Sequence, residues 1–207
     1  KWEAIVVENG AVSGAAEVVT NLDDTRLRYT YLKEGNRSLA RNFGLLQARG
    51  DLVAFLDDDD CFLPDKLAAQ LSVLVQQPET GLVACGAVLI DDHNHVLGDW
   101  RLWEYSPDLN FESCIAGCYL MPSVVLMRRQ WFEQVANFNP ELPPAEDTDL
   151  FLRLMLAGCR MSWIRSCLCQ YRVHEGSSQG AVAKYARSRW SMIENLLQAA
   201  NLPASVR

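Results

Sequence analysis

Apolar runs of strand length alternate with helix-like segments over the first 78 residues, and this alternation constrains the fold more than any other feature. It predicts, in order, a strand Ala4–Val7, a helix Ala15–Leu22, a strand Leu27–Leu32, a helix from the N-cap Ser38 through Ala48, a strand Leu52–Leu56 and a helix from Pro64 to Pro78. Such alternation is typical of parallel βαβ units with right-handed crossovers. The first half is therefore expected to form a mostly parallel, Rossmann-like α/β sheet flanked by helices.

The second half has a different pattern. Two predicted strands, Leu82–Ile90 and Val96–Trp103, flank a polar turn, and residues 104–122 are predicted to be irregular. The remaining predicted elements are a strand Val124–Met127, a helix from about Thr148 to Ala157 that ends at Gly158, two short strands after it, and a final helix of about Ala181–Ala200. These elements predict a smaller, mixed or antiparallel part. Because no repeat or linker interrupts the chain, we expect a single domain.

Composition narrows the class of protein. The 207 residues are 49% hydrophobic and 22% charged, which excludes wholesale disorder. The net charge of −7 argues against a nucleic-acid binder, which would present a basic face. No apolar run reaches the ~18 residues of a membrane span, and the first residues do not resemble a signal peptide. The 7 cysteines lie partly within apolar runs, so reduced core thiols and a cytoplasmic location are expected.

Four consecutive aspartates, Asp57 to Asp60, follow the predicted strand Leu52–Leu56. Ligands of open α/β sheets bind at the carboxyl ends of strands. Because neighbouring carboxylates repel one another, such a cluster favours a bound cation, and Mg²⁺ or Mn²⁺ suits oxygen ligands. An EF-hand is excluded, since Phe62 and Ala68 stand where that loop needs Gly and Glu. The alternative is a solvated acidic turn that caps the next helix.

Four motifs in order resemble the family 2 glycosyltransferases. The matching segments are Val6–Gly10, Ser38–Gly44 continued by Ala48–Asp60, Pro144–Arg153 and Tyr171–His174. The resemblance covers about residues 2 to 178 and implies the GT-A fold with nucleotide-diphosphate sugar donors. It divides the expected single domain, 1–207, into a donor-binding half (1–90), an acceptor-binding and catalytic half (91–178) and a C-terminal helix (179–207).

The resemblance implies a donor site built on the acidic cluster. Asp57 would contact the ribose or a phosphate, Asp58 belongs to the same nucleotide-sugar-binding turn, and Asp60 would cap the following helix. Glu8 takes the family's first acidic position and is the candidate for the nucleobase edge. Asn9 stands where a second acid is often found.

An arginine and a metal site complete the expected binding site for the sugar donor. Arg41 would face the nucleotide or its diphosphate, with a helix-surface salt bridge as the alternative. Asp59 would ligate Mn²⁺ or Mg²⁺. His174 would complete the metal shell through a ring nitrogen, with a hydrogen-bonded structural histidine as the alternative.

The resemblance implies that Asp147 is the catalytic base. A carboxylate there would take the proton from an acceptor hydroxyl as it attacks the anomeric carbon, and direct displacement predicts inversion. Because Asp147 precedes a predicted helix, the helix dipole is expected to favour its ionised form. Glu146 would bind the donor sugar or the acceptor. The alternative is that these acids merely cap the helix.

The implied function is a metal-dependent, inverting transfer of one sugar to a saccharide or lipid-linked acceptor, in cell-surface polysaccharide or glycoconjugate synthesis. Ala186 stands at the Gln position of the Gln-x-x-Arg-Trp motif of processive synthases, which argues for single-sugar transfer. The basic residues Lys184, Arg187 and Arg189 on the last helix would allow peripheral contact with anionic lipid at the inner face of the membrane.

One departure leaves alternatives open. The family begins one strand earlier than this chain does, so we expect that the sequence is incomplete at its start. A non-catalytic nucleotide-sugar-binding domain is therefore one alternative, although such a domain has no need of a base. A sugar-nucleotide nucleotidyltransferase is the other, although the Gly-rich N-terminal loop that it needs is not visible here.

Overall fold

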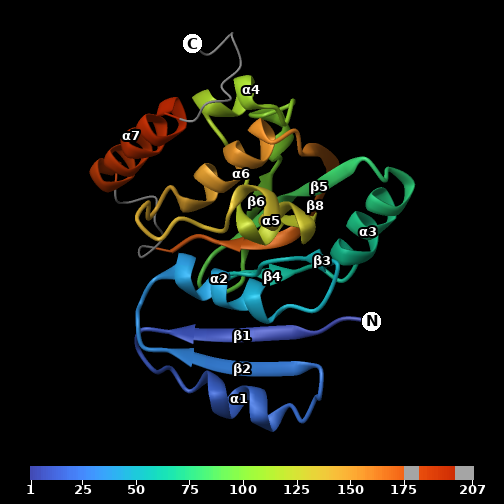
Figure 1. Cartoon of the computed structure of the whole chain (residues 1–207). Helices are drawn as coiled ribbons and strands as arrows, with labels where there is room; N and C mark the ends of the chain where they lie inside the picture. Colours follow the sequence, from blue (N-terminus) through green and yellow to red (C-terminus); the bar gives the residue numbers. More distant parts are fainter. Residues whose placement is uncertain (175–181, 199–207) are drawn as a thin grey trace.

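The computed structural model describes residues 1–174 and 182–198, and Figure 1 shows how its helices flank the strands. A small parallel sheet comes first. In it β1 (Ala4–Asn9) pairs with β2 (Leu27–Leu32), and α1 (Ala15–Asn21) is the crossover between the two strands. The helix α2 (Arg37–Gln47) packs against β1. Among the described residues, neither strand of this small sheet pairs with the larger one.

The larger sheet has the strand order β3-β7-β5-β8-β4, and β6 pairs with β5. Its strands are β3 (Leu52–Val53), β4 (Cys61–Phe62), β5 (Thr80–Ile90), β6 (Val96–Trp100), β7 (Val125–Arg128) and β8 (Arg160–Arg172). β5 and β8 run parallel, whereas the other pairs are antiparallel. The α/β class is as predicted, but the sheet is mixed rather than mostly parallel, because the strand before the acidic cluster pairs antiparallel with β7.

Two predictions in the first half are wrong in detail. Of the predicted buried strand Leu52–Leu56, only Leu52–Val53 pairs with a neighbour, and the segment is half-buried because β3 lies at the edge of its sheet. The N-cap of α2 is Asn36 and not Ser38. The Asn36 Oδ1 accepts hydrogen bonds from the Ser38 and Leu39 backbone N–H groups at 2.9 and 3.2 Å, a role in which Asn is among the most favourable residues.

The second half also differs locally from the prediction. β8 is one strand of 13 residues where two short strands were expected. Its register pairs Ala84 with Trp163 but Gly86 with Cys167, so residues 164–166 form a bulge in one continuous strand. The predicted irregular segment 104–122 contains a helix. The shorter elements here are η1 (Leu102–Glu104), α4 (Phe111–Ala116), η2 (Pro122–Val124) and α5 (Gln130–Val135).

Two long helices complete the fold. α6 (Glu146–Leu156) begins two residues before the predicted start, and α7 (Val182–Gln198) matches the predicted last helix. The predicted boundary between residues 178 and 179, and the predicted ends of the last helix at 181 and 200, lie outside the described residues. Arg189 donates a hydrogen bond to the Ile115 carbonyl at 2.6 Å, so this basic side chain packs against the protein.

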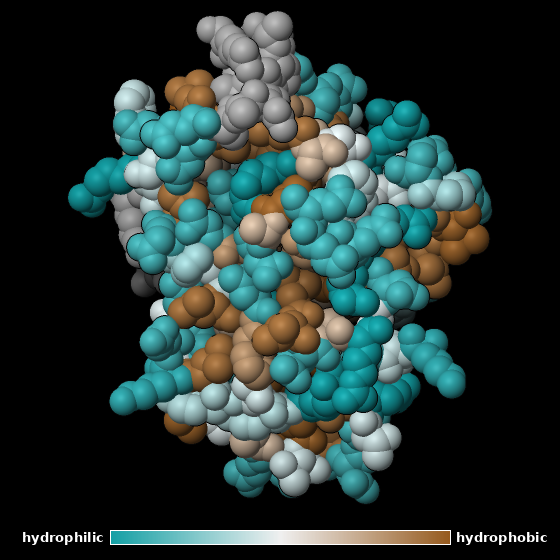
Figure 2. Space-filling view, in the orientation of Figure 1, coloured by the Kyte–Doolittle hydropathy of each residue, from teal (hydrophilic) through white to brown (hydrophobic). Residues whose placement is uncertain are grey.

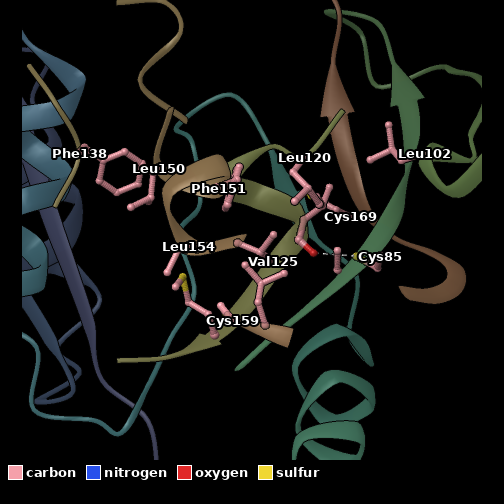
Figure 3. Close-up of a cluster of buried hydrophobic side chains, with 14 of the residues drawn as sticks. Cys85, Leu102, Leu120, Val125, Phe138, Leu150, Phe151, Leu154, Cys159 and Cys169 are labelled. Atoms are coloured by element: carbon pink, nitrogen blue, oxygen red, sulfur yellow. Dashed lines mark hydrogen bonds between the residues drawn. The ribbon is translucent and has the colours of Figure 1, made fainter. Parts of the chain in front are cut away.

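The core lies between α6 and the larger sheet (Figure 3). Leu150, Phe151 and Leu154 of α6 pack with Val125 of β7 and Cys85 of β5, and each of these side chains is at most 1% exposed. This packing fixes α6 against the sheet, and thereby fixes the position of the acidic residues in its first turn.

The described residues contain neither a disulfide nor a helix that could span a membrane, and both findings bear on the predictions. All seven cysteines lie in the described part of the chain and are free thiols, four of them buried. No helix within 1–174 or 182–198 is long and apolar enough to cross a bilayer.

The helix α3 (Lys66–Gln76) is oriented in an unexpected way. Its fully buried side chains include Lys66 and Gln70, whereas Leu67, Leu71 and Val75 are exposed and contribute to the brown surface over α3 in Figure 2. The apolar residues of the predicted helix therefore do not all face the core.

Candidate active site

Arg41 is the residue that joins the two acidic parts of the site. Its guanidinium donates to the Asp57 Oδ1 at 2.6 Å and to the Glu146 Oε1 at 3.1 Å, and only 11% of its side chain is exposed. Asn42, the next residue on α2, exchanges two hydrogen bonds with the Phe138 backbone at 2.8 and 2.9 Å. These bonds hold α2 in place. Arg41 thus makes ion pairs between elements, not the helix-surface salt bridge considered as its alternative.

Glu146 is the most deeply buried acid of the site. Its side chain is 1% exposed, and its Oε1 accepts from Arg41 and from the Arg37 Nε at 3.3 Å. Its Oε2 is buried and has no hydrogen-bond partner among the described residues. Because a buried, unpaired carboxylate oxygen is costly, this Oε2 is an unused hydrogen-bond acceptor inside the site. Glu146 does not act as a simple helix cap.

Asp147 follows Glu146 in the first turn of α6. Burial and the neighbouring Glu146 charge raise its pKa from the usual 3.8 to about 7, although the Arg41 charge and the hydrogen bond from the Thr148 N–H act in the opposite direction. The helix start was expected to favour the ionised form of Asp147, whereas the net shift of its pKa is upward. Burial and like charge outweigh the dipole. A carboxyl with a pKa near neutrality is suited to accept a proton.

The acidic cluster forms a turn between β3 and β4. The Asp57 N–H donates to the Ser123 Oγ at 3.1 Å, and Asp58 is exposed. Asp60 is buried, and its Oδ1 accepts from the Arg172 N–H at 3.1 Å. Burial raises the pKa of Asp60 to about 6. Asp60 does not cap the following helix as predicted, because its carboxylate binds a strand from a distant part of the chain.

Asp59 and His174 meet at the same turn. The His174 Nε2 lies 3.1 Å from the Asp59 Oδ2, and Arg172 fixes the Asp59 backbone by donating to its carbonyl at 3.0 Å. Two ligands at about 2.1 Å from one octahedral Mg²⁺ lie about 3 Å apart when they occupy adjacent positions. The pair therefore has the spacing of two metal ligands, and the same contact is a hydrogen bond, as the alternative of a structural histidine also predicts. Within the described residues no group of three His, Cys, Asp or Glu side chains is close enough to form a site by itself.

The candidate nucleobase contacts lie at the end of β1. Glu8 accepts hydrogen bonds from the Ser13 N–H, from the Ser13 hydroxyl and from the Tyr29 hydroxyl, and these bonds lower its pKa to about 2. Asn9 follows it at the last position of the strand and is half-buried. The Glu8 carboxylate is thus held ionised and in a fixed position. Its described bonds connect it with its own sheet and not with Arg41.

Three residues of the site were missed from the sequence. Arg37 shares Glu146 with Arg41, Ser123 supports Asp57, and Arg172 binds both Asp59 and Asp60. A signal existed for Arg172, which precedes His174 by two positions within the matching segment. Arg37 stands beside the matching segment that begins at Ser38. Nothing near Ser123 in the sequence marks it.

The site therefore combines a buried arginine that faces two carboxylates, an Asp59–His174 pair and a carboxyl with a near-neutral pKa at a helix start. This set is suited to a phosphorylated ligand and a proton transfer. Comparison with known proteins gives the family. The model of the "Glycosyltransferase like family 2" matches residues 1–195, and the chain belongs to this family.

Relatives and solved structures agree with this assignment. The O-antigen biosynthesis glycosyltransferase WbnJ of Escherichia coli is 28% identical over 207 aligned positions, which cover 94% of this chain and 78% of WbnJ. The crystal structure of S. aureus TarS 1–349 in complex with UDP-GlcNAc has a TM-score of 0.77 at 18% identity and covers 98% of this chain. The mannosyltransferase PcManGT from Pyrobaculum calidifontis, in complex with GDP-Man and Mn²⁺, has a TM-score of 0.69 at 19% identity over 97% of this chain.

The TarS and PcManGT chains are both longer than the present chain. It spans 59% of the TarS chain and 56% of the PcManGT chain. At this level of identity, the likeness shows that the fold is that of the GT-A glycosyltransferases.

Proposed function

We propose that the chain is an inverting, metal-dependent glycosyltransferase that moves one sugar from a nucleotide-diphosphate sugar to an acceptor hydroxyl. The observation that carries the proposal is the contact of Arg41 with Asp57 and Glu146, directly beside Asp147 with its pKa of about 7. The role of WbnJ in O-antigen biosynthesis supports a saccharide or lipid-linked acceptor in cell-surface polysaccharide or glycoconjugate synthesis. The UDP-GlcNAc and GDP-Man of the two structural relatives support the class of donor.

Asp147 is the proposed base. Its carboxylate takes the proton of the acceptor hydroxyl while that oxygen forms a bond to the anomeric carbon. The bond from the anomeric carbon to the diphosphate oxygen breaks, and its electron pair leaves with the nucleotide diphosphate. One displacement inverts the configuration. A base whose pKa is close to the working pH combines a useful ionised fraction with a useful driving force for proton transfer.

Arg41 is the proposed stabiliser of the leaving diphosphate. A guanidinium carries five N–H donors in a planar fork, so Arg41 can keep Asp57 and Glu146 and still donate to a phosphate. Because little of the Arg41 side chain is exposed, its charge stabilises a phosphate more strongly than an exposed charge would. Asp57 and Asp58 are the proposed contacts to the ribose and phosphates, Glu8 and Asn9 the contacts to the base, and Glu146 the contact to the donor sugar.

Asp59 and His174 are the proposed metal ligands. Asp59 and His174, whose facing atoms lie 3.1 Å apart, would hold the ion together with donor phosphates and water. A bound Mn²⁺ or Mg²⁺ supplies charge that stabilises the departing diphosphate. The Mn²⁺ in the PcManGT complex supports this assignment.

The seven free thiols support a reducing, cytoplasmic location for the reaction. Contact of α7 with the inner face of the membrane stays a prediction, to be tested with anionic vesicles. Arg189, one of its basic residues, donates to the Ile115 carbonyl and packs against the protein, which makes it poorly suited to lipid.

Thermal stabilisation by UDP, GDP and dTDP, each with Mn²⁺ or with EDTA, tests the donor site. A ligand at 100 times its Kd adds about 2.7 kcal/mol to the free energy of unfolding. We expect one nucleotide to raise the Tm, only with the metal, and we expect Asp59→Ala to abolish the shift. No shift for any nucleotide in the folded protein would contradict the proposal.

Turnover then separates an enzyme from a binding domain. The matching sugar donor is incubated with the wild type, with Asp147→Asn and with the control Asp92→Asn, whose residue is exposed on a turn. Release of the nucleotide diphosphate should fall at least 10²-fold in Asp147→Asn, while donor binding and the control stay unchanged. Binding without turnover in the wild type would favour the nucleotide-sugar-binding domain.

A further inference from the structure

The helix α3 buries polar residues where it has apolar ones available. Lys66 and Gln70 are 0% exposed, whereas Leu67 and Leu71 are 41% and 45% exposed. An amphipathic helix normally buries its leucines and exposes its lysines, and an unpaired buried charge is strongly unfavourable. The observed orientation therefore requires specific contacts that hold Lys66 and Gln70 inside.

The Lys66 ammonium has three such contacts. It donates to the Gln70 Oε1 at 2.9 Å and to the Val125 carbonyl at 3.3 Å, and it lies 4.0 Å from the centre of the Phe62 ring. These partners match its three N–H groups. None of the three is charged, and burial lowers the pKa of Lys66 to about 8.

Gln70 extends the network into the larger sheet. With its Oε1 taken by Lys66, its amide nitrogen donates to the Val83 and Val124 carbonyls, both at 2.9 Å. All hydrogen-bonding atoms of the Gln70 side chain are thereby used, which fixes its orientation. The pair binds the carbonyls of two consecutive residues, Val124 and Val125.

These contacts lead to both ends of the acidic turn. Val124 follows Ser123, whose hydroxyl accepts the Asp57 N–H at the start of the turn. Phe62 lies two residues after Asp60, at the end of the turn, in the strand β4 that pairs with β8. The buried ammonium thus connects the segment that supports the first aspartate with the segment that follows the last.

We propose that Lys66 and Gln70 are a positioning pair that holds the turn Asp57–Asp60 in the geometry needed for donor and metal. Lys66 contacts neither Asp57 nor Asp59 in the described bonds, so its action is indirect, through Ser123 on one side and Phe62 on the other. The consequence for activity rests on the proposed function. The consequence for the geometry of the turn does not.

The test compares three variants. Lys66→Met removes the three N–H contacts at similar side-chain length. The double variant Lys66→Met/Gln70→Leu also removes the Gln70 Oε1 that the single variant leaves unpaired, and should recover part of the Tm that the single variant loses, while the Val83, Val124 and Val125 carbonyls lose their side-chain donors in it. Leu74→Ala, on the same helix and 1% exposed, is a control that loses stability without touching the turn.

Two readouts are measured on each protein. The first is hydrogen exchange of the backbone amides of Asp57–Phe62 in the unliganded protein. The second is the Kd of UDP, GDP or dTDP with Mn²⁺, for whichever nucleotide stabilises the wild type. We expect at least tenfold faster exchange and at least tenfold weaker binding in both Lys66 variants. Leu74→Ala should change the Kd less than twofold.

The double variant decides the question. If it regains the wild-type Tm together with wild-type exchange and Kd, the pair is merely structural and the proposal is overturned. If it regains the Tm but keeps fast exchange at the turn, the pair positions the turn. Should no nucleotide bind even the wild type, the exchange readout still decides for or against positioning, and the proposed function is what fails.

Discussion

Replacement of Asp147 by asparagine is expected to make the protein more stable above neutral pH while it abolishes activity. Burial and the Glu146 charge raise the pKa of Asp147 from 3.8 to about 7, so the folded chain holds a proton that the unfolded chain releases. Between about pH 3.8 and pH 7 the folded state therefore binds more protons than the unfolded state. Stability therefore falls as pH rises, and it levels off above pH 7.

The size of the effect follows from the same shift. One pKa unit corresponds to about 1.4 kcal/mol, so the wild type should lose roughly 2–3 kcal/mol from this group between pH 5 and pH 8. The amide in the Asp147→Asn variant does not titrate and avoids the loss. The difference in unfolding free energy between Asp147→Asn and the wild type should therefore change by roughly 2–3 kcal/mol in favour of the variant over this pH range.

Urea unfolding at pH 5, 6, 7 and 8 measures this difference, because other titrating groups cancel between the two proteins. Asp92→Asn, at an exposed turn, is the control and should give a difference that does not depend on pH. A difference for Asp147→Asn that stays flat, or that moves in favour of the wild type as pH rises, would show that folding does not raise the pKa of this carboxyl. The argument for Asp147 as the base would then be lost.

Three further outcomes are expected. Below about pH 7 the kcat/KM should fall up to tenfold per pH unit as Asp147 becomes protonated, which a pH–rate profile from 5 to 9 will show. Gly81→Ala should cost about 1–3 kcal/mol in chemical denaturation, because its Cβ would lie 2.3 Å from the Trp131 Nε1 and 2.5 Å from the Cys159 Sγ; an unchanged midpoint would contradict the close packing of this strand. Asn36→Ala should lower the free energy of unfolding by about 1 kcal/mol through loss of the α2 cap. If Ser38 were the cap, Ser38→Ala would show this loss and Asn36→Ala would not.

Local sequence patterns were enough to predict most of the helices and strands. The predicted strand Leu27–Leu32 has the bounds of β2, because period and flanking residues decide such an element without help from the rest of the chain. The misjudged strand Arg160–Arg172 shows the limit of this reasoning. Its bulge at residues 164–166 is set by the register with β5, which lies about 80 residues earlier.

Long-range partners explain what was missed in the site. The aspartates were visible as a cluster, but Ser123 and Arg172 reach them from residues 66 and 112 positions away in the chain. The pKa of Asp147 was also misjudged for this reason. Its helix position was evident from the sequence, whereas the burial that raises the pKa depends on how α6 packs on the sheet. Buried Lys66 was hidden because the leucines beside it gave the more obvious amphipathic pattern.

The separate ladder of β1 and β2 has a consequence for the dynamics of the protein. Because the described part of this two-stranded sheet shares no ladder hydrogen bonds with the larger sheet, its attachment depends on packing contacts such as those of α2 with β1, and we expect residues 4–32 to open before the core of Figure 3 does. Glu8 lies on this segment, so a nucleotide that contacts Glu8 together with Asp57 binds the closed form alone. Occupancy of the donor site will then shift the population toward closure, and the amides of β1 will exchange more slowly in the nucleotide-bound protein than in the free one.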